Sequence, residues 1–504
     1  MSNPVSSTMR LVAGAWVLVR YDALAPREIS DLLPPTARFF AGFLRLFAGP
    51  QAKEGRPGER LARAFEHLGP VSIKLGQLLS TRADIFGAVF AEDLSRLKDR
   101  LPPFERAVAR AEVERTLGKP VESLYSEFGE PVAAASIAQA HRARLHDGRL
   151  VAVKVLRPGV ERRVAVDVDA MRLGARWVEA MVPRARRLEP IAFVATVARS
   201  LELELDLRLE ASAVSELGEI MARDPYMHAP KVVWPGVGRR ALTLEWAEGV
   251  PLSDPAALEQ PGIDRKALAD NVIRGFLAQA LDHGTFHADL HEGNLFFAPP
   301  AKLTAVDFGI VGRIGPRERR YLAEILWGFI RRDYQRVAEV HFEAGYVPDT
   351  HSVAQFAQAL RAVGEPVFGR LAGEVSMGRL LAQLFEITAV FDMRLRPELV
   401  LLQKTMVTVE GVARRIYPDH DIWAAASPVV ERWIARELSP PKRLLEAGRE
   451  ALNAMRSIAR AAEAATTPAP ATIIRHDESL TRWAIAIAVA ALMAAGYAIY
   501  LARS

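Results

Sequence analysis

The sequence predicts an α+β fold with two lobes, and three of its features support this prediction. At 504 residues the chain is longer than one typical domain, so a two-lobed protein with appendages is expected. The hydrophobic pattern changes from helical to strand-like near residue 131 and returns to helical after residue 160. Short apolar runs at 295–297 and 303–306 then predict a second pair of strands within a mostly helical C-terminal half.

The composition excludes several classes of function. The net charge of +5 comes from 65 basic and 60 acidic residues, a balance that excludes the strongly basic surface of a nucleic-acid-binding protein. Cysteine is absent, which excludes disulfides, thiolate metal sites and cysteine catalysis. The N-terminus carries no convincing cleavable signal peptide, because its short apolar run has no small-residue cleavage site after it.

Residues 284–309 contain the most informative motif. They read GTFHADLHEGNLFFAPPAKLTAVDFG and place His287, Asp289 and Asn294 in an HxDxxxxN arrangement, followed by Asp307 in DFG. In a kinase-type site one carboxylate meets the nucleophile, while an amide oxygen and a second carboxylate hold Mg²⁺ against the phosphates of ATP. The spacing therefore predicts Asp289 as the catalytic carboxylate and Asn294 and Asp307 as metal ligands, with ATP and Mg²⁺ as cofactors.

The N-terminal lobe is predicted to supply the remaining nucleotide contacts. Lys154, within VAVK, is the expected phosphate-pairing lysine on the third strand. Adenine is expected to bond the backbone of the interlobe hinge near Glu245 and Ala247. In the loop expected over the phosphates, small side chains stand in place of glycines: Ala133, Ala134, Ala135, Ser136 and Ala138, with Ile137 among them as a further nucleotide-binding residue. Because alanine does not reach the positive φ values open to glycine, this loop should be stiffer than a glycine-rich one.

Three carboxylates in the helical region at 160–222 are spaced for one helix face. Glu202, Asp206 and Glu210 fall at successive i, i+4 positions, where like charges repel by a few tenths of a kcal/mol. Lys154, Lys74 or Mg²⁺ would offset that repulsion. We expect Glu210 to pair with Lys154, although spacing alone does not choose among the three acids, and a solvated acidic face is the alternative.

An earlier apolar helix carries Lys74, Gly76 and Gln77 in the sequence GPVSIKLGQLLS. A buried lysine needs a partner, because desolvating an unpaired ammonium costs several kcal/mol. On this evidence alone, a lysine whose stem reaches solvent is the commoner arrangement and the expected one.

The C-terminal segment is predicted to anchor the chain in a membrane. Residues 440–465 read as an amphipathic helix, residues 466–472 as a linker, and residues 483–501 form an uncharged run long enough to span a bilayer once. Small residues recur in this run at a spacing that suits packing against a second copy: Ala486, Ala490, Ala494 and Ala498. A buried alanine-rich helix is the alternative. The flanking charge does not settle orientation, and the catalytic body is expected in the cytoplasm because no export signal precedes it.

Taken together, these motifs resemble the UbiB family of atypical protein-kinase-like ATPases. The resemblance covers most of the chain and rests on an ordered set: KLGQ at 74–77, AAASIAQAH at 133–141, VAVKV at 151–155, ELDLRLEA at 204–211, HADLHEGN at 287–294, VDFG at 306–309 and KTMVTVEG at 404–411. It implies a bilobal protein-kinase-like fold. It also implies an N-terminal helical extension whose KxGQ motif, here Lys74, Gly76 and Gln77, packs over the site where a protein substrate would bind.

The resemblance further maps the family's ExD pair to Glu204 and Asp206 and its helix C glutamate to Glu210. It implies a role in ubiquinone biosynthesis, in which ATP hydrolysis drives or regulates the handling of polyprenyl-phenol intermediates. The implied partners are inner-membrane lipids, these quinone intermediates and other ubiquinone-biosynthesis proteins. The sequence departs from the family at Leu290, where proline is frequent, and in having one clear membrane segment where relatives often have two.

Two other functions stay open from the sequence. A conventional protein kinase is disfavoured because no APE-type sequence closes an activation segment after DFG. A non-catalytic lipid-binding pseudokinase scaffold is disfavoured because it has no need to keep Lys154, Asp289, Asn294 and Asp307. The predicted organisation is an N-terminal helical extension at 1–130, an N-lobe with a helical insert at 131–252, a helical C-lobe at 253–438, an amphipathic helix and linker at 439–480, and a transmembrane anchor at 481–504.

Overall fold

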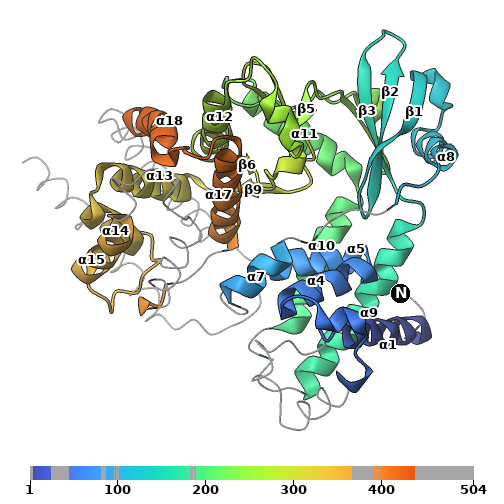
Figure 1. Cartoon of the computed structure of the whole chain (residues 1–504), viewed down its shortest axis with the longest axis horizontal. Helices are drawn as coiled ribbons and strands as arrows, with labels where there is room; N and C mark the ends of the chain where they lie inside the picture. Colours follow the sequence, from blue (N-terminus) through green and yellow to red (C-terminus); the bar gives the residue numbers. More distant parts are fainter. Residues whose placement is uncertain are drawn as a thin grey trace, which may run out of the picture. The chain divides into compact units, whose positions relative to one another are not determined.

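The fold is given by a computed structural model of the chain (Figure 1). The structure describes residues 4–23, 45–80, 87–95, 97, 102–181, 186, 189–365, 387, 390–393 and 397–437. The chain divides into two compact units, Met1–Ala435 and Arg436–Ser504. The predicted amphipathic helix at 440–465 and the predicted membrane segment at 483–501 lie outside the described residues. Among the helices that are described, none is both long and apolar enough to cross a bilayer.

The N-terminal lobe is built on an antiparallel four-stranded sheet in the order β1-β2-β3-β4. Its strands are β1 (Tyr125–Ala134), β2 (Ala138–Leu145), β3 (Leu150–Leu156) and β4 (Ala241–Glu245). The prediction that residues up to about 130 are helical is therefore wrong at its C-terminal end, where β1 begins at Tyr125. Irregular pairing explains this, because register shifts near Phe128 and Pro131 break the alternation of buried and exposed side chains that identifies a strand.

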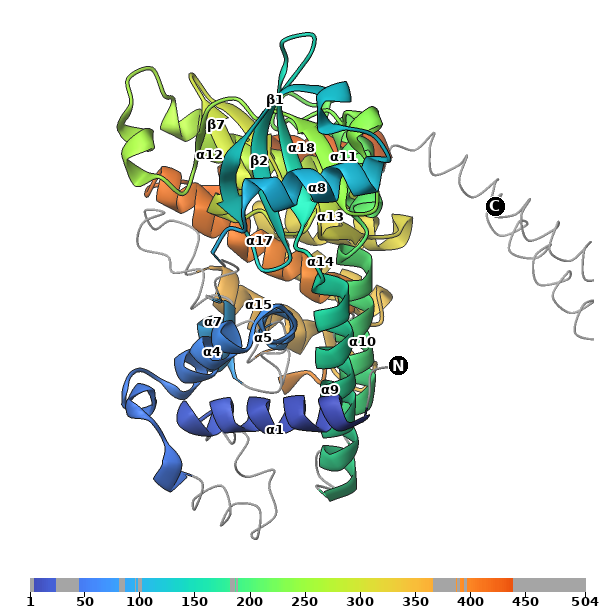
Figure 2. The same cartoon turned by 90° about the vertical axis from the view of Figure 1, so that its right-hand side faces the viewer.

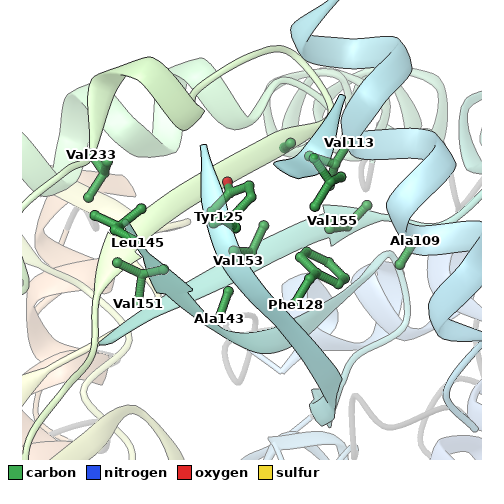
Figure 3. Close-up of a cluster of buried hydrophobic side chains, with 12 residues drawn as sticks. Ala109, Val113, Tyr125, Phe128, Ala143, Leu145, Val151, Val153, Val155 and Val233 are labelled. Atoms are coloured by element: carbon green, nitrogen blue, oxygen red, sulfur yellow. The ribbon is translucent and has the colours of Figure 1, made fainter. Parts of the chain in front are cut away.

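The core of this lobe lies between the sheet and helix α8 (Arg106–Leu117), as Figure 3 shows. Val113 of α8 meets the valines of β3, and Val153 and Val155 are fully buried there. On a strand, alternate side chains point to opposite faces. Because the valines at 151, 153 and 155 face this core, Lys154 projects from the other face of the sheet, toward the rest of the molecule.

Two further groups of helices belong to the N-terminal half of the chain. The insert between β3 and β4 contains α9 (Val160–Met181), α10 (Pro190–Glu204) and α11 (Leu207–Met221), and the N-terminal region contains α1 (Pro4–Arg20), α4 (Pro57–Leu68), α5 (Pro70–Leu79) and α7 (Ala88–Ser95). Figure 2 shows α9 and α10 side by side, with α1 packed on α9. Helix α5 contacts both α9 and α10. The N-terminal helices therefore pack on the insert of the N-terminal lobe.

The predicted acidic helix face does not exist. The helix stops at Glu204, and Asp206 adopts an extended backbone and caps α11 by accepting a hydrogen bond from the N–H of Arg208. Aspartate favours such N-cap positions because its side chain competes for backbone donors. Glu202, Asp206 and Glu210 therefore lie on different elements: Glu202 is exposed near Arg199, while Glu210 is buried.

The C-terminal lobe is mostly helical and holds two small sheets. Its helices are α12 (Arg265–Ala278), which continues as a π-helical turn (Gln279–His283), α13 (Pro316–Arg331), α14 (Tyr334–Glu343), α15 (Val353–Gly364), α17 (Pro397–Ile416) and α18 (Ile422–Glu437). The sheets pair β5 (Val250–Pro251), β7 (Leu295–Ala298) and β8 (Lys302–Ala305), and β6 (Thr285–His287) with β9 (Val311–Arg313). The strand pair predicted at 295–306 is therefore present as β7 and β8.

We predict that Phe128→Ala destabilises the N-terminal lobe by about 3–5 kcal/mol, because it removes a buried ring from between Tyr125 and His141. Denaturant unfolding followed by circular dichroism measures the change. Glu127→Ala, on the exposed side of the same strand, is the matched control and should be near neutral. Equal midpoints for the two variants would contradict the assignment of this core.

Candidate active site

Lys154 lies between two carboxylates that come from distant parts of the chain. Its Nζ donates to Glu210 Oε1 at 2.7 Å and Oε2 at 2.9 Å, and to Asp307 Oδ1 at 3.1 Å. β3 supplies the lysine, α11 the glutamate, and the turn after β8 the aspartate. The expected ion pair between Lys154 and Glu210 is present, and it is joined to the DFG sequence through Asp307.

The charges in this cluster depend on one another. Burial alone would lower the pKa of the Lys154 ammonium, but Asp307 and Glu210 outweigh it and raise that pKa above its usual value. The ammonium in turn lowers the pKa of the Asp307 carboxyl. Burial raises the pKa of Glu210 to about 7, with Lys154 opposing the shift. Lys154 and Asp307 are therefore charged at neutral pH, and the charge of Glu210 depends on its contact with the lysine.

His287 connects the HxD sequence with DFG. This fully buried ring accepts a hydrogen bond at Nδ1 from the N–H of Asp289, 3.1 Å away, and its Nε2 donates to the carbonyl oxygen of Val306 at 3.2 Å. The ring also packs on Phe308, with centroids 4.8 Å apart. Burial lowers the pKa of His287, which keeps the ring neutral and able to make both bonds. The side chain of His287 thus holds together the backbone of Asp289 and the backbone of Val306, the residue before Asp307.

Asn294 and Asp307 present oxygen atoms suited to Mg²⁺. The side-chain nitrogen of Asn294 donates to the carbonyl oxygen of Asp289 at 3.0 Å, which leaves its amide oxygen as the atom for a metal. Asp307 has a left-handed backbone, with φ at +59°, a conformation that is uncommon outside glycine and concentrated at functional sites. Among the described residues no group of three or more His, Cys, Asp or Glu could hold a metal on its own. One carboxylate and one amide fit Mg²⁺, which keeps several waters and takes phosphate oxygens as further ligands.

The alanine-rich loop is shorter than predicted and is tied to the end of β3. Ala133 and Ala134 end β1 and Ala138 begins β2, so only residues 135–137 form the connection. The N–H of Ala135 bonds the Ala138 carbonyl at 2.8 Å. Arg157 bonds the loop twice, from its N–H to the Ile137 carbonyl at 2.8 Å and from Nε to the Ala135 carbonyl at 3.0 Å. Residues 133–138 all have negative φ, so the loop keeps the conformations that alanine allows.

In the hinge after β4, fewer backbone donors are available to adenine than the sequence indicated. The N–H of Glu245 already bonds the Lys231 carbonyl at 2.9 Å, and the N–H of Trp246 bonds the Leu150 carbonyl at 3.0 Å. The side chain of Glu245 pairs with Arg149 at 3.2 Å. The backbone N–H of Ala247, the other predicted hinge residue, is therefore the better candidate donor to a base.

Lys74 is buried and does not reach solvent, so that prediction is wrong. Its ammonium forms an ion pair with Glu204, the last residue of α10, and both side chains are mostly buried. Gly76 allows α5 to pack closely on a different set of neighbours, because a Cβ there would lie 2.3 Å from Leu97 Cδ1 and 2.7 Å from Phe65 Cδ2. Gln77 lies on the next position of α5 and is partly buried, while Asp206 caps α11. Lys74 of the KxGQ motif and Glu204 of the ExD motif are therefore in direct contact.

The sequence did not predict the structural roles of two residues, His287 and Arg157. His287 was noticed only as part of HxDxxxxN, since nothing in the motif shows that its ring bonds both loops. Arg157 follows the VAVK strand, and its bonds to the alanine-rich loop depend on a tertiary approach without a spacing signal. The catalytic, nucleotide-binding and metal-binding roles assigned to the other residues stay predictions.

We predict that Lys74→Met costs about 3 kcal/mol of stability, because it leaves Glu204 as an uncompensated charge in a mostly buried position. The double variant Lys74→Met, Glu204→Leu should recover most of that loss. Thermal or denaturant unfolding of the full cycle measures both effects. Glu202→Leu, on the exposed side of α10, is the control for the glutamate change, and equal stability of the single and double variants would contradict the pairing.

Comparison with known proteins agrees with this geometry. Residues 96–341 match the ABC1 atypical kinase-like domain, and residues 360–421 match the UbiB helical domain. A Marinobacter nauticus protein named "Probable protein kinase UbiB" is 41% identical, with the match covering 86% of this chain and 79% of that protein. A Cellvibrio japonicus protein of the same name is 39% identical, covering 86% and 78%.

A solved structure supports the fold. The complex of Rv3197 with erythromycin from Mycobacterium tuberculosis superposes with a TM-score of 0.52 at 23% identity, covering 78% of this chain and 98% of that one. At this identity the likeness concerns the fold alone, and it agrees with the predicted kinase-like arrangement of helices and strands. With relatives at about 40% identity over most of the chain, this protein belongs to the UbiB family of ABC1 atypical kinase-like proteins.

Proposed function

We propose that this protein is an Mg²⁺-ATP-dependent phosphoryl-transfer enzyme, an ATPase or small-molecule kinase, that supports ubiquinone biosynthesis at the inner membrane. The observation that carries the proposal is the contact of Lys154 with both Glu210 and Asp307. A kinase-type site requires a lysine paired with a helix glutamate and a DFG aspartate in place to hold Mg²⁺, and these contacts bring the three side chains together.

In this proposal each side chain of the site has one task. Lys154 orients the phosphates, and Glu210 fixes the lysine. Asn294 and Asp307 would hold Mg²⁺, which neutralises charge on the phosphates when bound. Asp289, partly exposed and fixed through its backbone by His287, accepts the proton of the attacking water or hydroxyl group.

The proposed acceptor is water or a small hydroxyl compound. Only residues 310–315 lie between DFG and α13, which leaves little chain for the activation segment of a conventional protein kinase. Helix α5 is fixed beside the insert by the Lys74 and Glu204 pair, in agreement with an extension that keeps proteins from the site. A protein acceptor is the second candidate, because the relatives are named probable protein kinases.

The lipid and membrane parts of the proposal come from the family and the sequence. We propose that ATP turnover serves the handling of polyprenyl-phenol intermediates, together with other ubiquinone-biosynthesis proteins. We also propose that the uncharged segment at 483–501 anchors the chain as a single span, with the catalytic body on the cytoplasmic side. The alanine row in that segment would allow two copies to pair.

We predict that Asp307→Asn lowers Mg²⁺-dependent ATP turnover by about 10²-fold or more, because it removes a metal ligand and a charge that fixes Lys154. Release of phosphate from ATP, measured for the full chain in vesicles, gives the readout. Asp147→Asn, in the exposed turn between β2 and β3, is the matched control and should turn over as the wild type does.

Undiminished turnover in Asp307→Asn would contradict the assignment of the site. Nucleotide binding without any turnover by the wild-type protein, even with membrane and a phenolic lipid present, would favour the scaffold function. Transfer of phosphate to members of a protein panel would favour the protein kinase.

The pathway assignment has a separate test. We predict that deletion of the gene lowers the ubiquinone content of the cells, because the intermediates are no longer processed. Lipid extraction and mass spectrometry measure quinone and precursors, with a strain that carries the gene on a plasmid as the control. Normal quinone levels in the deletion strain would overturn the assignment to this pathway.

A further inference from the structure

Helix α17 is attached directly to the catalytic loop. Thr405 Oγ1 donates to the carbonyl oxygen of Ala288 at 3.2 Å, next to Asp289, and Arg415 pairs with Glu292 at 2.6 Å. The helix also packs on α12 and β9. Residues 404 and 405 of α17 therefore lie at the loop that carries the proposed catalytic carboxylate.

Lys404 precedes Thr405 on α17 and is partly buried. Burial lowers the pKa of its ammonium; the Asp289 carboxylate opposes that shift, and the Lys74 ammonium adds to it. The charge of Lys404 therefore interacts with Asp289 of the catalytic loop and with Lys74 of the KxGQ helix. Within the described part of the chain, none of the carboxylates lies within ion-pair distance of Lys404.

The other two lysines of the site differ in this respect. Lys154 has Glu210 and Asp307 as partners, and Lys74 has Glu204. A partly buried ammonium without a carboxylate partner is costly to keep, and the cost is offset when an anion binds it. The anion that a kinase-type site brings closest to the catalytic aspartate is the terminal phosphate group of the nucleotide.

We propose that Lys404 of α17 binds the terminal phosphate of the nucleotide and is a further substrate-contacting residue of this site. This inference rests on the proposed function and deepens it. Lys154 then holds the inner phosphates from the N-terminal lobe, and Lys404 holds the outer one from the C-terminal lobe. A nucleoside triphosphate would engage both lysines, whereas a diphosphate would engage only the first.

The test compares the binding of two nucleotides to the full chain. Lys404→Met removes the charge at similar volume and should weaken binding of a Mg²⁺-bound, non-hydrolysable ATP analogue about tenfold or more, while Mg²⁺-ADP binding changes less than about twofold. Lys404→Arg keeps the charge and should recover much of the affinity for the triphosphate. Lys266→Met, an exposed lysine of α12, is the control for the loss of one positive charge.

Binding constants from calorimetry and a melting curve for each variant decide the outcome. Equal loss for both nucleotides in a folded Lys404→Met protein, or unchanged affinity for the triphosphate, overturns the inference and leaves the proposed function intact. If Lys404→Met does not fold, the inference is tested with Lys404→Arg instead. An affinity of Lys404→Arg for the triphosphate as low as that of Asp307→Asn would then overturn the inference. If the wild-type protein binds neither nucleotide, the proposed function and this inference both fail.

Discussion

The contact of Lys154 with Glu210 and Asp307 is the constraint on which the site depends. A charged lysine with little access to water requires both carboxylates, and each comes from a different element, so the ion pair holds β3, α11 and the DFG turn at one place. Several features of the fold serve this contact. The alternation of β3 turns Lys154 away from the valine core, and the ring of His287 holds Val306, the residue before Asp307, to the catalytic loop.

The break between α10 and α11 links this contact to the N-terminal helices. Because the helix ends at Glu204 and restarts after the Asp206 cap, Glu204 and Glu210 diverge: the first reaches Lys74 of α5 and the second reaches Lys154 of β3. The two pairs remain electrically connected, since the charge of Glu204 contributes to the raised pKa of Glu210. Separation of Lys74 from Glu204 would leave more negative charge beside Glu210 and thereby alter the environment of Lys154.

The strands and the catalytic motifs could be predicted from the sequence, because they follow from local periodicity and from chemistry with fixed spacing. The pairing of Lys154 with Glu210 was expected as well, but spacing did not choose among the three acids, and the family resemblance indicated Glu210. Predictions from the sequence were wrong where tertiary structure overrides periodicity. The i, i+4 spacing of Glu202, Asp206 and Glu210 indicated one helix face, but the capping preference of Asp206 ends the helix between them. Lys74 was expected to reach solvent because its partner, Glu204, is distant in sequence. The irregular pairing of β1 similarly concealed a strand that begins at Tyr125.

Helix α17 explains why a helical segment after the kinase-like domain belongs to the same functional unit. The match to the UbiB helical domain covers residues 360–421, which include α17, and this helix bonds the catalytic loop at Ala288 and Glu292. The kinase-like domain match ends at residue 341, so it contains Asp289 but not the helix that supports it. The buried hydrogen bond from Thr405 and the ion pair of Arg415 hold the catalytic loop against α17. The site is therefore assembled from the N-terminal helices, the kinase-like domain and α17. The kinase-like motifs describe only the second of these regions.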